Sequence, residues 1–117
     1  MSYLLLIVEP PGQRAERGRV AGEAAYASMQ RFAEGLQARG VLRAVESLVS
    51  TTDAVRVTRR EGRRSLLDGP FAEAKEMIGG FFLLAGVTRA EAIDIAADCP
   101  AAAWATVEVR EVGPCWR

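Results

Sequence analysis

Carboxylates, arginines, one lysine and two cysteines are the side chains available for chemistry in this sequence, because histidine is absent. Without an imidazole there is no Ser-His-Asp triad, no Cys-His pair and no His-ligated metal. Lys75 is the only lysine among fifteen cationic residues. Any proton transfer must therefore use a carboxylate, with arginine to orient an anionic group.

Glu46 is the first candidate for catalytic acid/base work. In the alternation of the segment 41–48, Leu42, Ala44, Glu46 and Leu48 share one side, so Glu46 is a carboxylate on an otherwise apolar face. Burial on such a face tunes a carboxyl for acid or base chemistry. The structural alternative, which we favour, is an ion pair with Arg56 or Arg110.

Asp68 is the second candidate, as a general base or ligand acceptor. The alternative is structural, since an Asp before Gly-Pro commonly caps a turn with its own side chain. The residues proposed to bind a ligand are Arg56, Phe71, Glu73, Lys75 and Arg110.

Lys75 invites a Schiff-base or anion-binding role, but the flanking Glu73 and Glu76 favour a charged, ion-paired lysine. Cys99 is expected at a helix C-terminus, where the dipole opposes a thiolate, so it is interpreted as an inert structural thiol. Oxygen ligands at the spacing of a metal-binding loop are not present. No metal and no cofactor are therefore expected.

The elements that must position these residues begin with an all-apolar strand, Leu4 to Val8, ended by Pro10-Pro11-Gly12. Apolar residues then recur at helical spacing from about Arg17 to Arg39, and Gly40 is expected to end this helix. Val41 to Leu48 is predicted as a second strand.

A hairpin and a second strand-helix-strand unit follow. The hairpin strands are Val55 to Thr58 and Ser65 to Leu67, and helical propensity marks Ala72 to Glu76. Gly79-Gly80 indicates a bulge or close backbone approach before the apolar strand Phe81 to Ala85. A capping box, Thr88 with Glu91, starts a helix through Ile93, Ala96 and Ala97 that ends before Pro100, and Ala105 to Val109 is the last strand.

This order predicts an α+β sandwich of ferredoxin-like kind, βαβ(ββ)βαβ, with both helices on one sheet face. The strands Leu4 to Val8 and Phe81 to Ala85 are apolar on both sides, and no third long helix is available to cover the second face. We therefore predict a homodimer packed sheet against sheet.

Composition limits compartment and partners. Formal net charge is zero, the N-terminal apolar run is too short for a signal peptide, and no stretch is long enough to cross a membrane. The four arginines in Arg59 to Arg64 are interpreted as a solvated hairpin tip rather than a nucleic-acid patch. We expect a cytoplasmic protein with no membrane or direct nucleic-acid partner.

The string from Asp68-Gly69-Pro70-Phe71 to Glu76, followed by Gly79-Gly80-Phe81, resembles the DGPF branch of the YCII-related family. The resemblance covers nearly the whole chain, 1–117, as one domain. It implies a dimeric α+β barrel with a cleft between the sheet and its surrounding elements. The His-Asp pair of the YCII-like branch does not transfer, because Cys99 precedes Pro100 and histidine is absent.

Two functions remain open. The first is an unknown small molecule bound in the cleft, with carboxylate acid/base catalysis by Glu46 and Asp68 and with Arg56 or Arg110 orienting an anionic group. The second comes from the resemblance, since relatives of the DGPF branch occur beside, or fused to, extracytoplasmic-function sigma factors. It is a non-catalytic accessory protein with a sigma factor as partner, acting in trans.

Overall fold

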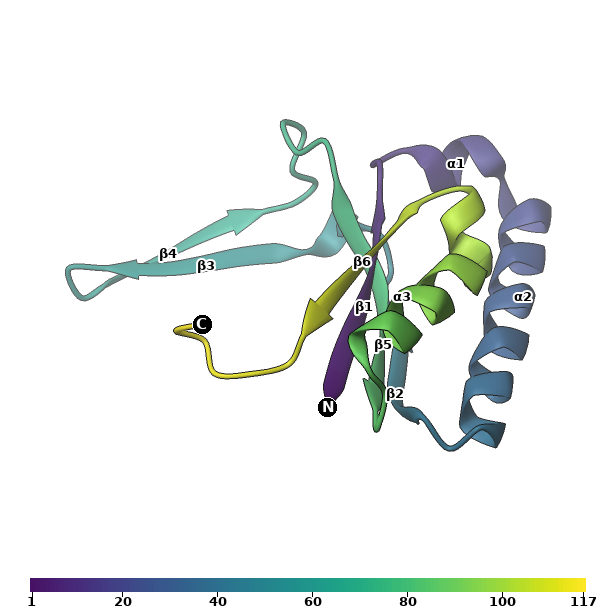
Figure 1. Ribbon diagram of the computed structural model, residues 1–117. Coiled ribbons are helices and arrows are strands. Elements are labelled where there is room, and N and C mark those ends of the chain that lie inside the picture. Colours follow the sequence, from purple (N-terminus) through teal and green to yellow (C-terminus); the bar gives the residue numbers. More distant parts are fainter.

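The computed structural model describes all residues, 1–117, and contains a four-stranded antiparallel sheet with strand order β2-β5-β1-β6. The strands are β1 (Ser2–Glu9), β2 (Leu42–Ser47), β5 (Met77–Ala85) and β6 (Thr106–Glu111). Figure 1 shows the helices α2 (Arg19–Ala38) and α3 (Arg89–Asp98) on one side of this sheet. The predicted ferredoxin-like α+β architecture is confirmed. No helix is long and apolar enough to span a membrane.

The remaining elements are short, apart from one hairpin. They are α1 (Gln13–Arg17), the 3-10 turns Thr51–Asp53 and Pro100–Ala103, and the two-stranded sheet of β3 (Val55–Arg60) and β4 (Arg63–Asp68). The hairpin turn at Glu61-Gly62 has two positive φ angles, 52° and 76°, which is the backbone of a type I′ turn.

Helix ends follow the sequence signals closely. Gly40 has φ +73° after α2, and the Gly40 and Val41 amides donate to the carbonyls of Gln37 and Leu36, so the predicted C-terminal cap is a Schellman motif. At α3, Thr88 and Glu91 form both hydrogen bonds of the capping box. The α3 residues that enter the core are Ala92, Ile95 and Ala96, whereas Ile93 is exposed.

One local prediction was wrong, and one short helix was not predicted. Ala72 to Glu76 forms a turn instead of a helix, since five residues joining the hairpin to β5 are too few for a helix that nothing packs against. A separate helix, α1, also precedes α2, and the positive φ of Gly18 divides the two.

Strand alternation separates the two faces of the sheet. On β1 the side chains of Tyr3, Leu5, Ile7 and Glu9 are buried beneath the helices, whereas Leu4, Leu6 and Val8 are half-buried on the other side. Opposed residues share a face, so Phe81 and Leu83 lie with Leu6 and Leu4 on this second side. We call the side that contacts α2 and α3 the helix face and the other the open face.

The core lies on the helix face. It consists of strand and helix side chains that include Leu5, Leu36, Phe82, Leu84 and Ile95, and Phe32 meets Phe82 edge-to-face at 5.5 Å between ring centroids. Cys99 is part of this core and its sulfur lies 3.8 Å from that of Met29. The predicted structural role for Cys99 agrees with this burial.

Candidate functional site

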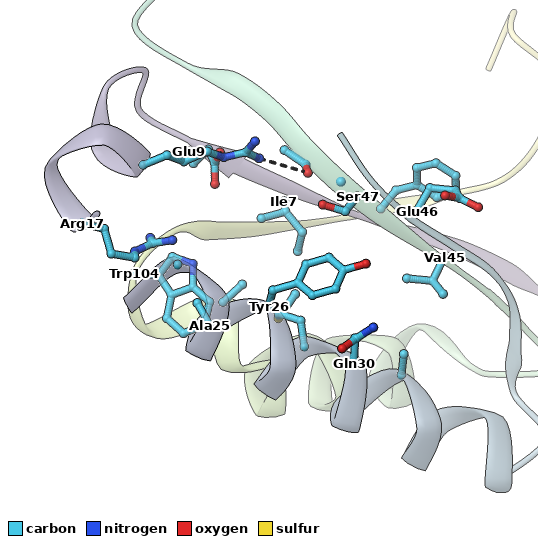
Figure 2. Close-up of a pocket in the computed structure, with 18 of the residues that line it drawn as sticks. Ile7, Glu9, Arg17, Ala25, Tyr26, Gln30, Val45, Glu46, Ser47 and Trp104 are labelled. Carbon is cyan, nitrogen blue, oxygen red and sulfur yellow. Dashed lines mark hydrogen bonds and ion pairs between the residues drawn. The ribbon is translucent and has the colours of Figure 1, made fainter. Parts of the chain in front are cut away.

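A groove of about 720 Å³ separates the first half of α2 from the sheet. Its walls are mostly apolar side chains of β1, α2 and β5, including Ile7, Met29 and Phe82. Figure 2 shows Tyr26 reaching from α2 toward the strands, with Trp104 and Arg17 at one end. Tyr26 remains 53% exposed, so its ring is accessible in the groove.

Glu9 is the buried charge of this groove. It is the last residue of β1, follows Ile7 on the helix face, and is only 4% exposed. Arg14 of α1 donates from Nε to Glu9 Oε1 at 2.6 Å. The same guanidinium donates to the carbonyls of Leu48 at 2.7 Å and Gly79 at 3.3 Å. All three guanidinium nitrogens of Arg14 are thus used to hold the carboxylate against the ends of three strands.

The double glycine explains how this pair fits. A Cβ at Gly79 would lie 2.8 Å from Arg14 Nη2 and 2.9 Å from the Glu9 carboxyl, closer than side-chain carbons approach other groups. A Cβ at Gly80 would lie 2.8 Å from the backbone oxygen of Glu46. The β1–β5 register also shifts at Ile7/Val8. The bulge and the close approach predicted for Gly79-Gly80 are both present.

Trp104 closes one end of the groove through polar contacts with α1. Gln13 donates to the Trp104 carbonyl at 2.7 Å, and the Arg17 guanidinium lies 5.3 Å from the centre of the Trp104 ring, a cation–π contact. Trp104 and Glu9 also border a second cavity, which Lys75 and Glu76 help to line.

Glu46 lies on the open face, not in this groove. Its partner in the β2–β5 ladder is Phe81, whereas Val45 pairs with the buried Phe82, so Glu46 borders the groove only at its edge. A register shift between Leu42 and Ala44 places Leu42 on the helix face, so these two residues do not share the side predicted for them. The Glu46 side chain is exposed and forms no ion pair, and the interpretation as a pair with Arg56 or Arg110 was wrong for the single chain.

The other predicted site residues are dispersed. Arg110 is on the open face, opposite Leu4, and contacts Glu108 at 3.8 Å. Arg56 stacks on the Phe71 ring at 3.8 Å, so these two residues meet each other. Asp68 pairs with Val55 at the base of the hairpin, and its side chain makes no hydrogen bond that would cap the turn.

Glu73 and Lys75 are exposed in the loop before β5, and Lys75 forms no ion pair with Glu73 or Glu76. Glu46 and Asp68 are therefore not gathered with the proposed ligand-binding residues into one cavity of this chain. Their catalytic and binding roles stay predictions.

Glu9 was not predicted because Pro10 indicates an end of the first strand after Val8. Continuing the alternation Tyr3, Leu5, Ile7 by one step reaches Glu9, which was the available signal. Arg14 gave no signal, because its contacts with β1, β2 and β5 arise only from the tertiary structure.

Fold and groove together define a class: a ferredoxin-like α+β protein with a cleft between its sheet and longer helix. The model of the YCII-related domain matches residues 1–115, and the chain belongs to the YCII-related family.

The chain is similar to one curated protein in sequence and to a solved structure in fold. An uncharacterised protein of Rhizobium meliloti (strain 1021) is 42% identical over 59 residues, which cover 50% of this chain and 48% of that protein. The chain thus matches about half the length of this relative. A solved structure of similar fold is 5-chloro-2-hydroxyhydroquinone dehydrochlorinase (TftG) from Burkholderia phenoliruptrix AC1100, in complex with 2,5-dihydroxybenzoquinone. It has a TM-score of 0.57 and 16% identity, and the match covers 97% of this chain and 94% of that one.

Proposed function

We propose that this protein binds a small planar organic molecule in the groove beneath α2, with the Glu9 carboxylate as its polar anchor. The observation that carries the proposal is a buried carboxylate, fixed by Arg14, within an otherwise mostly apolar groove. The groove volume falls in the range of about 300–1,000 Å³ typical of ligand sites, which combine apolar walls with a few placed polar groups.

The free oxygen of Glu9 determines what the ligand should offer. Arg14 occupies Oε1, whereas Oε2 accepts no hydrogen bond within the chain and is not sealed from solvent. A carboxylate oxygen is an acceptor, so the matching ligand group is a hydroxyl or another donor. The aromatic surfaces of Tyr26 and Trp104 suit a planar ring.

The molecule bound to TftG, 2,5-dihydroxybenzoquinone, is a flat ring, in agreement with a planar ligand. Its hydroxyl groups are acidic because each is conjugated with a carbonyl, so the reduced hydroquinone is the form that offers neutral hydroxyl donors to Glu9. In an enzymatic form of the proposal, Glu9 takes the proton of such a hydroxyl as general base. Glu9 would then have the acid/base role that the sequence analysis assigned to Glu46 and Asp68. Nothing in the structure favours the accessory role with a sigma factor, which stays a prediction.

The homodimer is the second part of the proposal. Leu4, Leu6, Val8, Phe81 and Leu83 leave the centre of the open face apolar and only half-buried. A second copy seated on this face would cover it, as the paired sheets of a dimeric α+β barrel do.

Binding can be measured through Trp104, which is one of two tryptophans. Trp116→Phe removes the exposed tryptophan and leaves the one beside the groove. Titration of this variant with the hydroquinone form of 2,5-dihydroxybenzoquinone should quench its fluorescence with saturation, and calorimetry of the unmodified chain should give the same Kd. The quinone itself, which is ionised at neutral pH, should bind more weakly because Glu9 repels an anion. Absence of binding for this quinone and for the corresponding hydroquinone would overturn the proposed ligand class.

Two glycines of α2 provide a blocking variant and its control. A Cβ at Gly22 or at Gly35 meets nothing within 4 Å, but only Gly22 lines the groove. Both Gly22→Leu and Gly35→Leu should raise helix stability, since glycine costs about 1 kcal/mol in a helix interior. Gly22→Leu should weaken binding about tenfold or more by filling the groove, whereas Gly35→Leu should bind normally. Equal affinity in the two variants would place the ligand elsewhere.

A further inference from the structure

The hairpin of β3 and β4 is the least covered part of the molecule. All twelve of its strand residues are exposed, including Val57 at 62% and Leu66 at 53%. The two strands pair with each other and with no other strand. An isolated two-stranded hairpin is marginally stable in water. The hairpin therefore lacks a packing partner within its own chain.

The ladder register gives the hairpin two unlike faces. Val55, Val57 and Leu66 share one face, because Val57 lies opposite Leu66 and Val55 is two residues away. The same face also carries Arg59 and Arg64 toward the tip, while the other face holds Thr58, Ser65 and Arg56, which is engaged by Phe71, with Leu67 as its one apolar side chain. The face with Val55, Val57 and Leu66 is thus the one prepared to pack against apolar surface.

The hairpin projects from the sheet on the side opposite α2 and α3 (Figure 1). This is the side of the open face. The Cα radius of gyration, 16.0 Å, exceeds the value of about 13 Å for a compact chain of this length. A partner that packs on the open face would consequently lie beside the hairpin.

The net charge of the hairpin favours one kind of partner. The hairpin, 55–68, contains five arginines and two acids, Glu61 and Asp68, and so carries a formal charge of +3. Because the whole chain is neutral, the remaining residues carry −3. The hairpin and the rest of a second copy therefore carry opposite net charges, which favours their association.

We propose that the hairpin is a dimerisation arm, which packs its Val55, Val57 and Leu66 face against the side of a second copy seated on the open face. This rests on the homodimer proposed above. Under two-fold symmetry the hairpin of each copy packs against the other copy, so the dimer contains two equivalent arm contacts. A six-residue strand spans about 20 Å and packed sheets lie about 10 Å apart, so the arginine tip reaches past the partner's sheet to its helix layer.

A pair of glutamate substitutions tests the arm. Val57→Glu puts a charge on the apolar face, and Thr58→Glu puts the same charge one residue away on the opposite face; both sites are exposed in the single chain. Dimer Kd is measured by sedimentation equilibrium, and circular dichroism checks that both variants fold. Val57→Glu should weaken the dimer by about tenfold or more, and Thr58→Glu by less than about threefold. Amide exchange of residues 55–68 should slow when the unmodified chain dimerises.

The outcomes separate the arm from the dimer. An unmodified chain that is monomeric at about 100 μM, a concentration at which even a weak dimer of this interface class forms, overturns both ideas. A dimer whose Kd is the same with Val57→Glu, or whose hairpin amides exchange as in the monomer, leaves the homodimer standing and overturns the arm. Equal weakening by both substitutions overturns the assigned face. Neither result bears on ligand binding in the groove.

Discussion

Both faces of the four-stranded sheet carry large apolar side chains, but helices cover only one of them. On β1 the neighbours Leu5 and Leu6 differ in this respect alone, since Leu5 is fully buried under the helices and Leu6 is half-buried on the open face. Each face also holds a carboxylate: Glu9 is buried and ion-paired, whereas Glu46 is exposed and unpaired. Burial in one chain therefore distinguishes two residues that have the same chemistry.

The largest expected effect compares the two leucines. Leu5→Ala should destabilise the chain by about 3 kcal/mol, because it leaves a cavity in a closed core. Leu6→Ala should cost less than about 1 kcal/mol in the monomer, where solvent reaches the site. Urea unfolding of the monomer, at concentrations below the Kd of the proposed dimer, measures both values. Equal losses would mean that the open face is covered within the chain.

A smaller effect is expected for the two glutamates. Glu9→Gln should destabilise the chain by about 1–2 kcal/mol, since Arg14 then loses a charged partner of low exposure. Glu46→Gln should change stability by less than about 0.5 kcal/mol, as an exposed residue with no partner. Thermal unfolding at neutral pH compares the stabilities of the two variants. A larger loss of stability for Glu46→Gln than for Glu9→Gln would show that Glu46 has a partner outside the single chain.

The smallest expected effect concerns the two cysteines. Burial raises the pKa of the Cys99 thiol, whereas Cys115 is exposed. A raised pKa in the folded state contributes stability that is fully present at pH values below the usual thiol pKa, and this contribution is lost as pH rises from that usual value through the raised pKa of the folded chain. Iodoacetamide near pH 8 should modify Cys115 and leave Cys99 unmodified until the chain unfolds. Mass spectrometry reads the sites, and rapid labelling of Cys99 would indicate that the core opens beside Met29.

The local elements could be predicted because their signals are short-range. Gly40 ends α2 with a positive φ, and the Thr88/Glu91 box starts α3 through bonds between residues three apart. The helix predicted for Ala72 to Glu76 is absent, because the helical propensity of five residues is too weak to form a helix in the short connection between the hairpin and β5.

The candidate site was harder to predict because its residues are distant in sequence. Glu46 was favoured by alternation counted from Leu42, but the register shift after Leu42 changes which residues share a face. One irregular residue reverses every later assignment, because side chains in a strand alternate with a period of two. Glu9 was missed by placing the end of its strand one residue too early.

By itself, the sequence determined the fold class, the helix caps, the absence of imidazole chemistry and the apolar character of both sides of two strands. The tertiary structure decided which carboxylate is buried and which arginine holds it. Glu9, Arg14 and Gly79 are brought together only when β1, α1 and β5 meet. Alternation and capping act between neighbouring residues, whereas the surroundings of a charge depend on every element that packs around it.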